Sequence, residues 1–352
     1  MKTRHEGVCR PIHTLLLTVG VLAWLGCSPP LAAAQTAAKS APATAVQAVD
    51  SLAVTVSDMD RAVAFYTAVL SFQIIHDVEI KGSAYERLFG VFGAHIRVVR
   101  LQLGQEFVDL MQFLAPRGRL MPVTRSNDRW FQHMAIIVSD MDAAYQHLRA
   151  NNVAHASTAP QTIPAWNKAA GGIRAFYFRD PDGHFLEILW FPSGKGDERW
   201  HRKDALFLGI DHTAIVVDDT EASLALYRDA LGMRVVGGSE NYGPEQERLN
   251  NVFGARLRIT TLKANSGPAV EFLEYLSPGD GRPMPVDTRS NDIWHWHIQI
   301  RTADPMQSEA ATRARRAPWI SPGTVEVAGE KLGFTRGLMV RDPDGHAVLI
   351  TN

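Results

Sequence analysis

Cysteine is almost absent from this chain of 352 residues. The two cysteines, Cys9 and Cys27, both precede residue 34. If the chain is cleaved after Ala34, the remaining protein carries no sulfhydryl group. Disulfide bridges, thiolate metal ligands and a cysteine nucleophile are then excluded together.

Neither sign of charge is in excess, because 36 Lys and Arg residues stand against 37 Asp and Glu residues. This balance gives no electrostatic reason to expect a nucleic acid or an anionic membrane surface as a partner. The sequence also lacks the Gly-x-Ser-x-Gly elbow, the phosphate-binding Gly-Lys-Ser/Thr loop and the dinucleotide-binding Gly-x-Gly-x-x-Gly motif. Hydrolase, nucleoside triphosphatase and Rossmann functions therefore have no support.

The N-terminus has the pattern of a secretory signal peptide. Basic residues precede an apolar run at 15–25, and three alanines at 32–34 offer the small residues that a signal peptidase requires. The apolar run is shorter than the roughly 20 residues of a membrane-spanning helix. We expect a signal peptide at 1–34 and an exported, periplasmic protein without a membrane span. A retained membrane anchor is the alternative.

Two further expectations concern the chain before the folded part. Cys27 follows Leu25 and Gly26, so a lipidated N-terminus is a second alternative to cleavage after Ala34. Residues 35–48 are rich in Ala, Thr, Pro and Gln without periodicity, which is typical of a flexible linker. We expect folded structure from about Val49.

The rest of the chain repeats itself. The segment Arg119–His133 returns as Arg282–His297, and an Asp-Pro-Asp-Gly-His sequence occurs at 180–184 and again at 342–346. Such self-similarity indicates two copies of one domain. The copies are expected at 49–193 and 208–352, with a connector at 194–207.

Each copy contains two units with the same order of elements. Short β-branched segments precede a helical pattern, and three further apolar segments follow, which predicts βαβββ modules. The modules open near Leu52, His133, His212 and His297. Since one module of about 60 residues buries little surface, we expect modules to pair into domains of the α+β class.

The Asp-Pro-Asp-Gly sequences predict structure before chemistry. Asp at the first position, Pro at the second and Gly at the fourth are typical of a type I turn that leads into a hairpin. We therefore interpret Asp180 and Asp342 as turn residues rather than catalytic ones.

Several of these segments resemble the vicinal oxygen chelate superfamily. The resemblance is carried by Asp211–Val217 with Leu226–Gly232, by the Asp-Pro-Asp-Gly-His turns and by Leu186–Ile188. This superfamily includes glyoxalase I, methylmalonyl-CoA epimerases, ring-cleaving extradiol dioxygenases and bleomycin-resistance proteins. The resemblance implies two tandem glyoxalase-like domains, each a cupped mixed sheet around a divalent metal, with ligands on the first and last strands of each module.

Transferring that pattern gives two sets of candidate ligands. The first copy offers Ser51, Asp109, His133 and Glu187, and the second offers His212, Glu271, His297 and Leu349. Because Ser51 is a poor ligand and Leu349 is none, each set holds three donors. Imidazole and carboxylate donors suit a first-row divalent metal such as Zn, Ni, Mn, Co or Fe.

The residues themselves bear on this interpretation. Side chains alternate along a strand, so the small Ala214 shares a face with His212. Glu271 and Glu187 lie in apolar strands, where an unpaired carboxylate is costly unless a metal or partner neutralises it. Glu274 falls on the opposite face and is expected to be solvated or to contact a helix.

Alternatives to a metal site remain open. Histidines on strands are often only hydrogen-bonded, and a strand-end glutamate can pair with an arginine such as Arg258 or Arg336. His295 could be a pocket residue or a substitute ligand.

The resemblance implies three possible functions. In glyoxalase-like and epimerase-like members the metal polarises a carbonyl and a glutamate, here Glu271 or Glu187, moves a proton. In two-domain ring-cleaving dioxygenases a carboxylate stands where this chain has Leu349, which argues against that reaction. The third possibility is not an enzyme but a metal-free protein that binds and sequesters a small molecule, as the bleomycin-resistance proteins do.

Overall fold

The computed structural model describes residues 46–327 and 331–352. The expected signal peptide at 1–34 and most of the linker at 35–48 lie outside these residues, so export remains a prediction. The first strand begins at Val46, slightly before Val49. No helix within the described ranges is long and apolar enough to cross a membrane.

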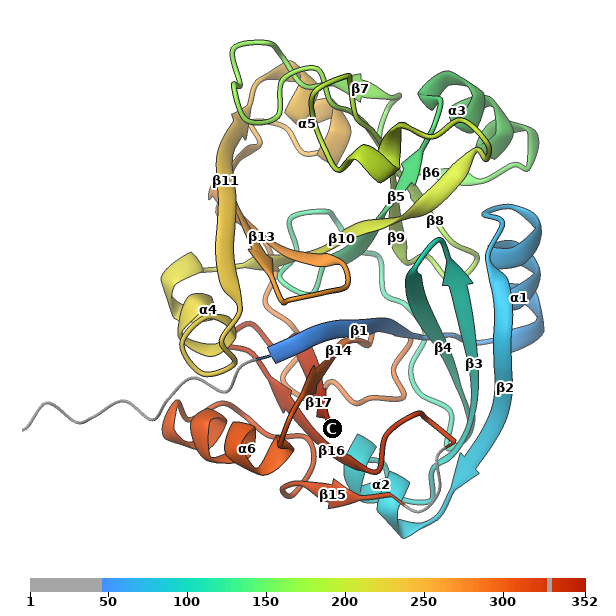
Figure 1. Ribbon diagram of the computed structural model, residues 1–352, viewed down its shortest axis with the longest axis vertical. Coiled ribbons are helices and arrows are strands. Elements are labelled where there is room, and N and C mark those ends of the chain that lie inside the picture. Colours follow the sequence, from blue (N-terminus) through green and yellow to red (C-terminus); the bar gives the residue numbers. More distant parts are fainter. Residues whose placement is uncertain (1–45, 328–330) are drawn as a thin grey trace, which may run out of the picture. The chain divides into compact units, whose positions relative to one another are not determined.

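Four modules follow one another along the chain (Figure 1). The first contains β1 (Val46–Thr55), α1 (Met59–Ala68), β2 (Gln73–Lys81), α2 (Ser83–Phe89), β3 (His95–Leu103) and β4 (Glu106–Ala115). The second contains β5 (Gln132–Val138), α3 (Met141–Ala150), β6 (Ala154–His155), β7 (Gln161–Thr162), β8 (Arg174–Arg179) and β9 (Phe185–Trp190). After a 3₁₀ turn at Glu198–His201, the third contains β10 (Phe207–Val217), α4 (Thr220–Tyr227), β11 (Arg234–Tyr242), α5 (Pro244–Asn250), β12 (Arg256–Lys263) and β13 (Ala269–Ser277). The fourth contains β14 (Trp296–Thr302), α6 (Pro305–Ala314), β15 (Val325–Glu326), β16 (Arg336–Arg341) and β17 (Ala347–Thr351).

The strands form two curled mixed sheets. The first sheet has the order β15-β16-β17-β14-β1-β4-β3-β2, and the second has the order β11-β12-β13-β10-β5-β9-β8-β6, with β7 paired to β8. The α+β class and the predicted modules are therefore confirmed. We call the concave faces of these sheets the first cup and the second cup.

The pairing of the modules differs from the expectation. The first sheet joins modules one and four, and the second joins modules two and three, because β1 pairs with β14 and β5 pairs with β10. The expectation that the two modules of one copy share a cup is therefore wrong. The segments at 116–131 and 278–295 carry the chain from one sheet to the other.

Each module enters its helix through the same local interaction. Asp58, Asp140, Asp219 and Asp304 precede α1, α3, α4 and α6, and their carboxylates accept hydrogen bonds from backbone N–H groups of the first helical turn. Aspartate at this position satisfies a donor that the helix leaves unpaired. These four aspartates therefore stabilise the starts of the four helices.

Alternating strand residues serve two different cores. Met134 and Ile136 on β5 belong to a large apolar cluster that also contains Leu52 of the first sheet. Ile137 belongs to a separate cluster in the second cup. The first cup is filled by a cluster whose large members include Tyr85, Phe89, Met111, Phe113, Phe334 and Met339.

The two repeated segments hold each other at the crossings between the sheets. Arg282 donates to Asp128, with Nη2 and Oδ2 2.5 Å apart, and Arg119 donates to Asp292, with the same atoms 2.7 Å apart. Each of these guanidinium groups also lies 4.7 Å from the ring centroid of a tryptophan of the other copy. An arginine of each copy is thus paired with an aspartate of the other.

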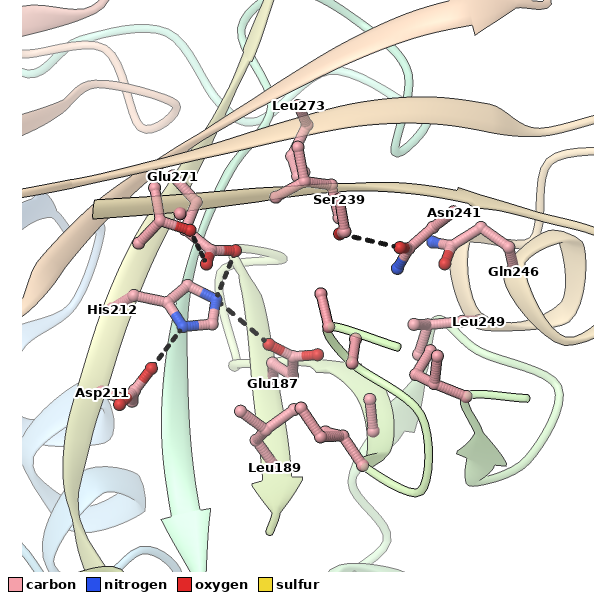
Figure 2. Close-up of a pocket in the computed structure, with 18 of the residues that line it drawn as sticks. Glu187, Leu189, Asp211, His212, Ser239, Asn241, Gln246, Leu249, Glu271 and Leu273 are labelled. Atoms are coloured by element: carbon pink, nitrogen blue, oxygen red, sulfur yellow. Dashed lines mark hydrogen bonds and ion pairs between the residues drawn. The ribbon is translucent and has the colours of Figure 1, made fainter. Parts of the chain in front are cut away.

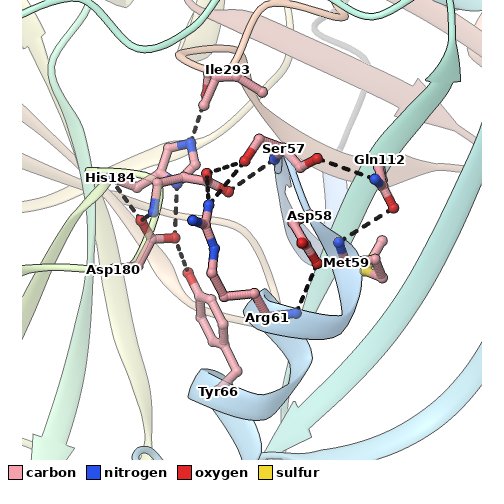
Figure 3. A network of polar contacts seen from close by, with 10 residues as sticks. Ser57, Asp58, Met59, Arg61, Tyr66, Gln112, Asp180, His184 and Ile293 are labelled. Atoms are coloured by element: carbon pink, nitrogen blue, oxygen red, sulfur yellow. Dashed lines mark hydrogen bonds and ion pairs between the residues drawn. The ribbon is translucent and has the colours of Figure 1, made fainter. Parts of the chain in front are cut away.

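The Asp-Pro-Asp-Gly-His turns also join the sheets, and Figure 3 shows the contacts of the first turn. Asp180 Oδ1 accepts from the backbone N–H groups of Asp182 and His184, both at 2.9 Å, as a turn residue does. His184 donates through Nδ1 to Asp180 at 2.8 Å and through Nε2 to the carbonyl of Ile293 at 2.6 Å. The carboxylate of Asp182 accepts from the backbone N–H of Ser57 in the first sheet at 2.9 Å.

The second turn repeats these contacts in the opposite direction. His346 Nε2 donates to the carbonyl of Val216 at 2.9 Å, and the backbone N–H of Asp218 donates to Asp344 at 3.0 Å. Burial tends to lower the pKa of His184, but the carboxylate of Asp180 outweighs burial and raises it. The turns are structural, as predicted, and their hydrogen bonds join one sheet to the other.

Replacing Asp128 with Asn tests the pairing at the crossings. Burial tends to raise the pKa of Asp128, but hydrogen bonds from Arg282 and Arg125 outweigh it and the pKa is lowered. We expect Asp128→Asn to reduce the free energy of unfolding by about 1.5–3 kcal/mol at pH 7. A carboxylate whose pKa is lowered in the folded state stabilises the fold at pH values above the pKa of the unfolded chain. This stabilisation is lost as the pH falls, so the difference in unfolding free energy between wild type and variant should shrink below about pH 4.

Chemical denaturation at several pH values measures this difference. Asp280→Asn is the control, because Asp280 pairs with the exposed Arg125 at the surface and should contribute little. An equal effect of both substitutions, or a difference that does not depend on pH, would contradict the assignment.

Candidate functional site

The second cup brings together four of the predicted ligand residues from four strands. His133 lies on β5, Glu187 on β9, His212 on β10 and Glu271 on β13. Figure 2 shows Glu187, Glu271 and His212 converging on one point. The pairing of β5 with β10 therefore completes a set of two imidazoles and two carboxylates.

Two alanines make room for these side chains. Ala214 lies opposite His133 in the antiparallel pair and beside Glu271 in the parallel pair. Ala135 lies opposite His212 in the antiparallel pair and beside Glu187 in the parallel pair of β5 with β9. Because neighbouring strands present their side chains on one face in register, each alanine leaves the space into which one histidine and one glutamate project.

Donor atoms of His133, Glu187 and His212 lie within 4.8 Å of one another, and Glu271 lies beside His212. Glu187 Oε2 lies 3.3 Å from His133 Nε2 and 3.6 Å from His212 Nε2, and His212 Nε2 lies 3.5 Å from Glu271 Oε2. With metal–ligand bonds of about 2.1 Å, neighbouring donors lie about 3.0 Å apart in an octahedron and about 3.4 Å apart in a tetrahedron. The separations fit these values.

Hydrogen bonding and charge both favour a cation at this point. The two ring nitrogens of His133 are buried and have no hydrogen-bond partner in the described part of the chain. Burial tends to lower the pKa of His212, but the carboxylates of Glu271, Asp211 and Glu187 outweigh it and raise it to about 10. The cluster thus holds positive charge strongly.

Neighbouring groups orient two of the four side chains. Asp211 accepts from His212 Nδ1 at 3.0 Å and from the indole N–H of Trp200 at 3.1 Å. Thr261, opposite Glu271 on β12, donates to Glu271 Oε1 at 2.8 Å. A carboxylate behind a histidine fixes the ring so that its other nitrogen points at the donor cluster.

The cluster opens onto a cavity of about 280 Å³. Its walls combine apolar side chains such as Ile163, Leu189 and Leu273 with a polar group of Ser239, Asn241 and Gln246 (Figure 2). The Glu271 side chain is 20% exposed and that of Glu187 is 5% exposed. Of the two carboxylates, Glu271 is therefore the more accessible from the cavity.

The equivalent positions of the first cup carry Ser51, Asp109, His297 and Leu349. Ser51 donates to Asp109 at 2.5 Å, and Arg100 Nη1 lies 3.8 Å from the same carboxylate. Burial lowers the pKa of His297 to about 3. Asp109, His297 and Leu349 border a space of about 20 Å³, which is too small for a substrate.

The predicted grouping of the ligands is therefore wrong, although four of the six predicted donors lie together. His297 and Asp109 lie in the first cup and do not approach His212, Glu271, His133 or Glu187. The reason is the pairing of modules two and three, which the two sequence copies do not reveal. One signal was available: modules two and three each keep a histidine and a glutamate, whereas modules one and four do not.

The remaining alternatives are also resolved by contacts. Arg258 pairs with Glu274 at 3.1 Å and Arg336 with Asp304 at 3.4 Å, so neither occupies the glutamates of the cluster. Glu274 also accepts from the Thr220 hydroxyl, which confirms a helix contact.

His295 is not a substitute ligand of the four-donor cluster. It borders a separate space of about 10 Å³, where Arg341 and His346 are its neighbours. Burial and the nearby His297 lower its pKa well below the ordinary value. His295 therefore belongs with the packing residues at the crossings.

Comparison with protein families gives one match that spans most of the chain. The family described as Glyoxalase/Bleomycin resistance protein/Dioxygenase superfamily matches residues 48–188 and 209–350. A 2-epi-5-epi-valiolone epimerase from Actinomyces sp. is 33% identical over 151 residues, which are 42% of this chain and 81% of that protein.

Solved structures show the same fold. Glyoxalase I from Zea mays has a TM-score of 0.55 at 15% identity, over 87% of this chain and 92% of that chain. A putative dioxygenase from Bacillus subtilis has a TM-score of 0.52 at 13% identity, over 88% of this chain and 86% of that chain. At such low identities the similarity concerns the fold alone.

Titration of the histidines tests the charge of the two cups. In chelator-treated protein we expect His212 to stay protonated at pH 8, because its pKa is about 10, and His297 to stay neutral throughout, because its pKa is about 3. Glu271→Gln should lower the pKa of His212, since it removes a neighbouring negative charge. Nuclear magnetic resonance of the imidazole carbons measures both. If His212 titrates near 6.5 in the wild-type protein, the account of the cluster is wrong.

Proposed function

The chain belongs to the Glyoxalase/Bleomycin resistance protein/Dioxygenase superfamily, and from this premise we propose that it is a divalent-metal-dependent enzyme with the chemistry of an epimerase or isomerase. The proposal is that it moves a proton at a carbon next to a carbonyl group. The observation that carries it is the convergence of His133, Glu187 and His212, with Glu271 beside His212, on a cavity in the second cup.

The donor set supports a first-row divalent metal. His133, Glu187, His212 and Glu271 would hold it, and Zn, Ni, Mn, Co and Fe all accept such nitrogen and oxygen ligands. The unpartnered ring nitrogens of His133 support the same assignment, since buried polar atoms without partners are costly. When bound, a divalent ion would act as a Lewis acid that polarises the substrate carbonyl.

The two glutamates supply the proton transfer in this proposal. Glu271 is the more accessible from the cavity and takes the proton from the carbon next to the carbonyl. Thr261 donates to Glu271 Oε1, so Oε2 is the oxygen that faces the site, and while it takes the proton it would not also hold the metal. Epimerisation returns a proton to the opposite face of that carbon, and in this proposal Glu187, which is related to Glu271 across the β5–β10 pair, would supply it.

The named relative supports this class of reaction over the two alternatives. It is an epimerase, and the alignment covers most of its length. A sequestering protein that has lost its donors is disfavoured by the complete set of four in the second cup. Ring cleavage has no observation of its own in its favour, because the similarity to a putative dioxygenase concerns the fold alone.

Metal content tests the proposed site. We expect about one equivalent of divalent metal per chain when the protein is prepared without chelator, and we expect His133→Ala with His212→Ala to lose it. His297→Ala is the matched control, because His297 is the equivalent histidine of the filled first cup and should leave the metal content unchanged. Elemental mass spectrometry of the purified variants measures this. Metal that is absent from wild type, or lost in the control, would overturn the proposal.

Isotope exchange tests the role of Glu271. Metal-loaded protein in deuterated water should exchange the proton next to the carbonyl of hydroxyketones, and Glu271→Gln should slow exchange by about 10²–10⁴-fold. Glu274→Gln is the control, since Glu274 lies on the same strand but faces α4. Metal content is measured on each sample, so a loss of exchange without a loss of metal reports on the proton transfer. Equal rates for Glu271→Gln and wild type would exclude Glu271 as the base.

A further inference from the structure

The wall of the second cup away from the metal ligands is polar. Ser239 and Asn241 lie on β11 and Gln246 on α5, and Figure 2 shows them grouped apart from Glu271 and His212. Ser239 Oγ donates to Asn241 Oδ1 at 2.9 Å. Asn167, in the loop before β8, donates to the same oxygen at 2.7 Å.

This arrangement leaves a free donor on Asn241. Its carbonyl oxygen already accepts two hydrogen bonds, whereas its Nδ2 amide has no partner among residues 46–327 and 331–352. An amide nitrogen without a partner beside a cavity is available to an oxygen of a ligand.

Gln246 provides an acceptor beside this donor. The residue is 3% exposed, its Nε2 donates to Asn250, and its Oε1 has no hydrogen-bond partner in the described chain. Asn250 in turn donates to the Tyr275 hydroxyl at 2.7 Å, so a chain of hydrogen bonds fixes the position of the Gln246 side chain. A buried acceptor without a partner is costly unless a ligand donates to it.

The first cup shows that the fold does not require these polar residues. Modules one and three align through Val91–Ala94 and Val252–Ala255, which have the same sequence. The alignment pairs four residues of the hydrophobic cluster in the first cup with four polar residues of the second: Val78 with Ser239, Ile80 with Asn241, Tyr85 with Gln246, and Phe89 with Asn250. The same aligned positions therefore supply packed hydrophobic side chains to the first cup and hydrogen-bonding groups to the second cup.

The charge of the cavity walls disfavours an anionic group on the ligand. None of the described residues that line it is Lys or Arg, whereas Glu187, Asp211 and Glu271 are carboxylates. Phosphate and carboxylate groups are normally bound by arginine, lysine or a cluster of backbone N–H groups. The wall of Asn241 and Gln246 thus offers an anion no counter-charge.

The volume limits the size of the ligand. The cavity volume of about 280 Å³ lies just below the range of about 300–1,000 Å³ for small-molecule pockets. A single small molecule fits such a space, whereas a substrate attached to a nucleotide carrier would have to extend out of it.

We propose that Ser239, Asn241 and Gln246 form a specificity site that binds the hydroxyl groups of a small, uncharged, polyhydroxylated carbonyl compound. A hydroxyl group both donates and accepts, so it satisfies the Gln246 acceptor and the Asn241 donor together. This inference rests on the proposed function for the position of the carbonyl, which lies at the four metal ligands.

Binding measurements with matched ligands test the inference. We would use isothermal titration calorimetry on the metal-loaded protein with inosose (a cyclohexanone with five hydroxyl groups), its monophosphate ester and cyclohexanone. Inosose should bind at least about tenfold more tightly than either comparison ligand, because a site built for hydroxyls discriminates against ligands that lack them or carry charge. Equal or tighter binding of the phosphate ester or cyclohexanone would overturn the proposal, as would no binding of inosose.

Two variants assign the effect to the polar wall. Asn241→Leu and Gln246→Met keep side-chain size and remove the hydrogen-bonding groups, so each should weaken inosose binding by about tenfold and leave cyclohexanone binding unchanged. Glu240→Gln is the control, because Glu240 pairs with the exposed Arg256 and does not line the cavity. Variants that bind inosose as wild type does would contradict the assignment.

Metal content distinguishes a failure of the proposed function from a failure of the proposed specificity site. Wild-type protein without metal contradicts the proposed function. A normal metal content in the same samples, together with no preference for inosose, contradicts the specificity site alone.

Discussion

The antiparallel pairing of β5 with β10 is the interaction on which the site depends. It places Ala214 opposite His133 and Ala135 opposite His212, so that two imidazoles and their neighbouring glutamates enter one cup. A slip of one residue in this register would turn the histidines towards the apolar core. The two arginine–aspartate pairs between the repeated segments and the hydrogen bonds of His184 and His346 join the two sheets and so stabilise the strands that form this pair.

The two cups have one geometry and opposite chemistry. β1 and β14 repeat the register of the second cup, with Ala53 opposite His297 and beside Asp109. There a serine and an arginine satisfy the aspartate and apolar side chains fill the space. The first cup therefore adds core to the fold, while donors, cavity and hydrogen-bonding wall are concentrated in the second.

The sequence was sufficient for the parts of this account that depend on local pattern. The four modules, the Asp-Pro-Asp-Gly turns and the individual ligand candidates follow from periodicity, from the repeat and from the family resemblance. The partner of each module does not follow, because all four first strands are apolar and any two could pair. Connections as long as 116–131 and 278–295 permit either arrangement, as in domain swapping. The roles of Ala135 and Thr261 depend on that register and were missed for the same reason.

Anomalous diffraction from crystals of metal-loaded protein tests the central claim most directly, because it locates the metal relative to named atoms. The account predicts one strong peak within about 2.0–2.3 Å of donor atoms of His133, Glu187, His212 and Glu271. A peak beside His297 and Asp109 in the first cup, or no peak in either cup, would contradict it.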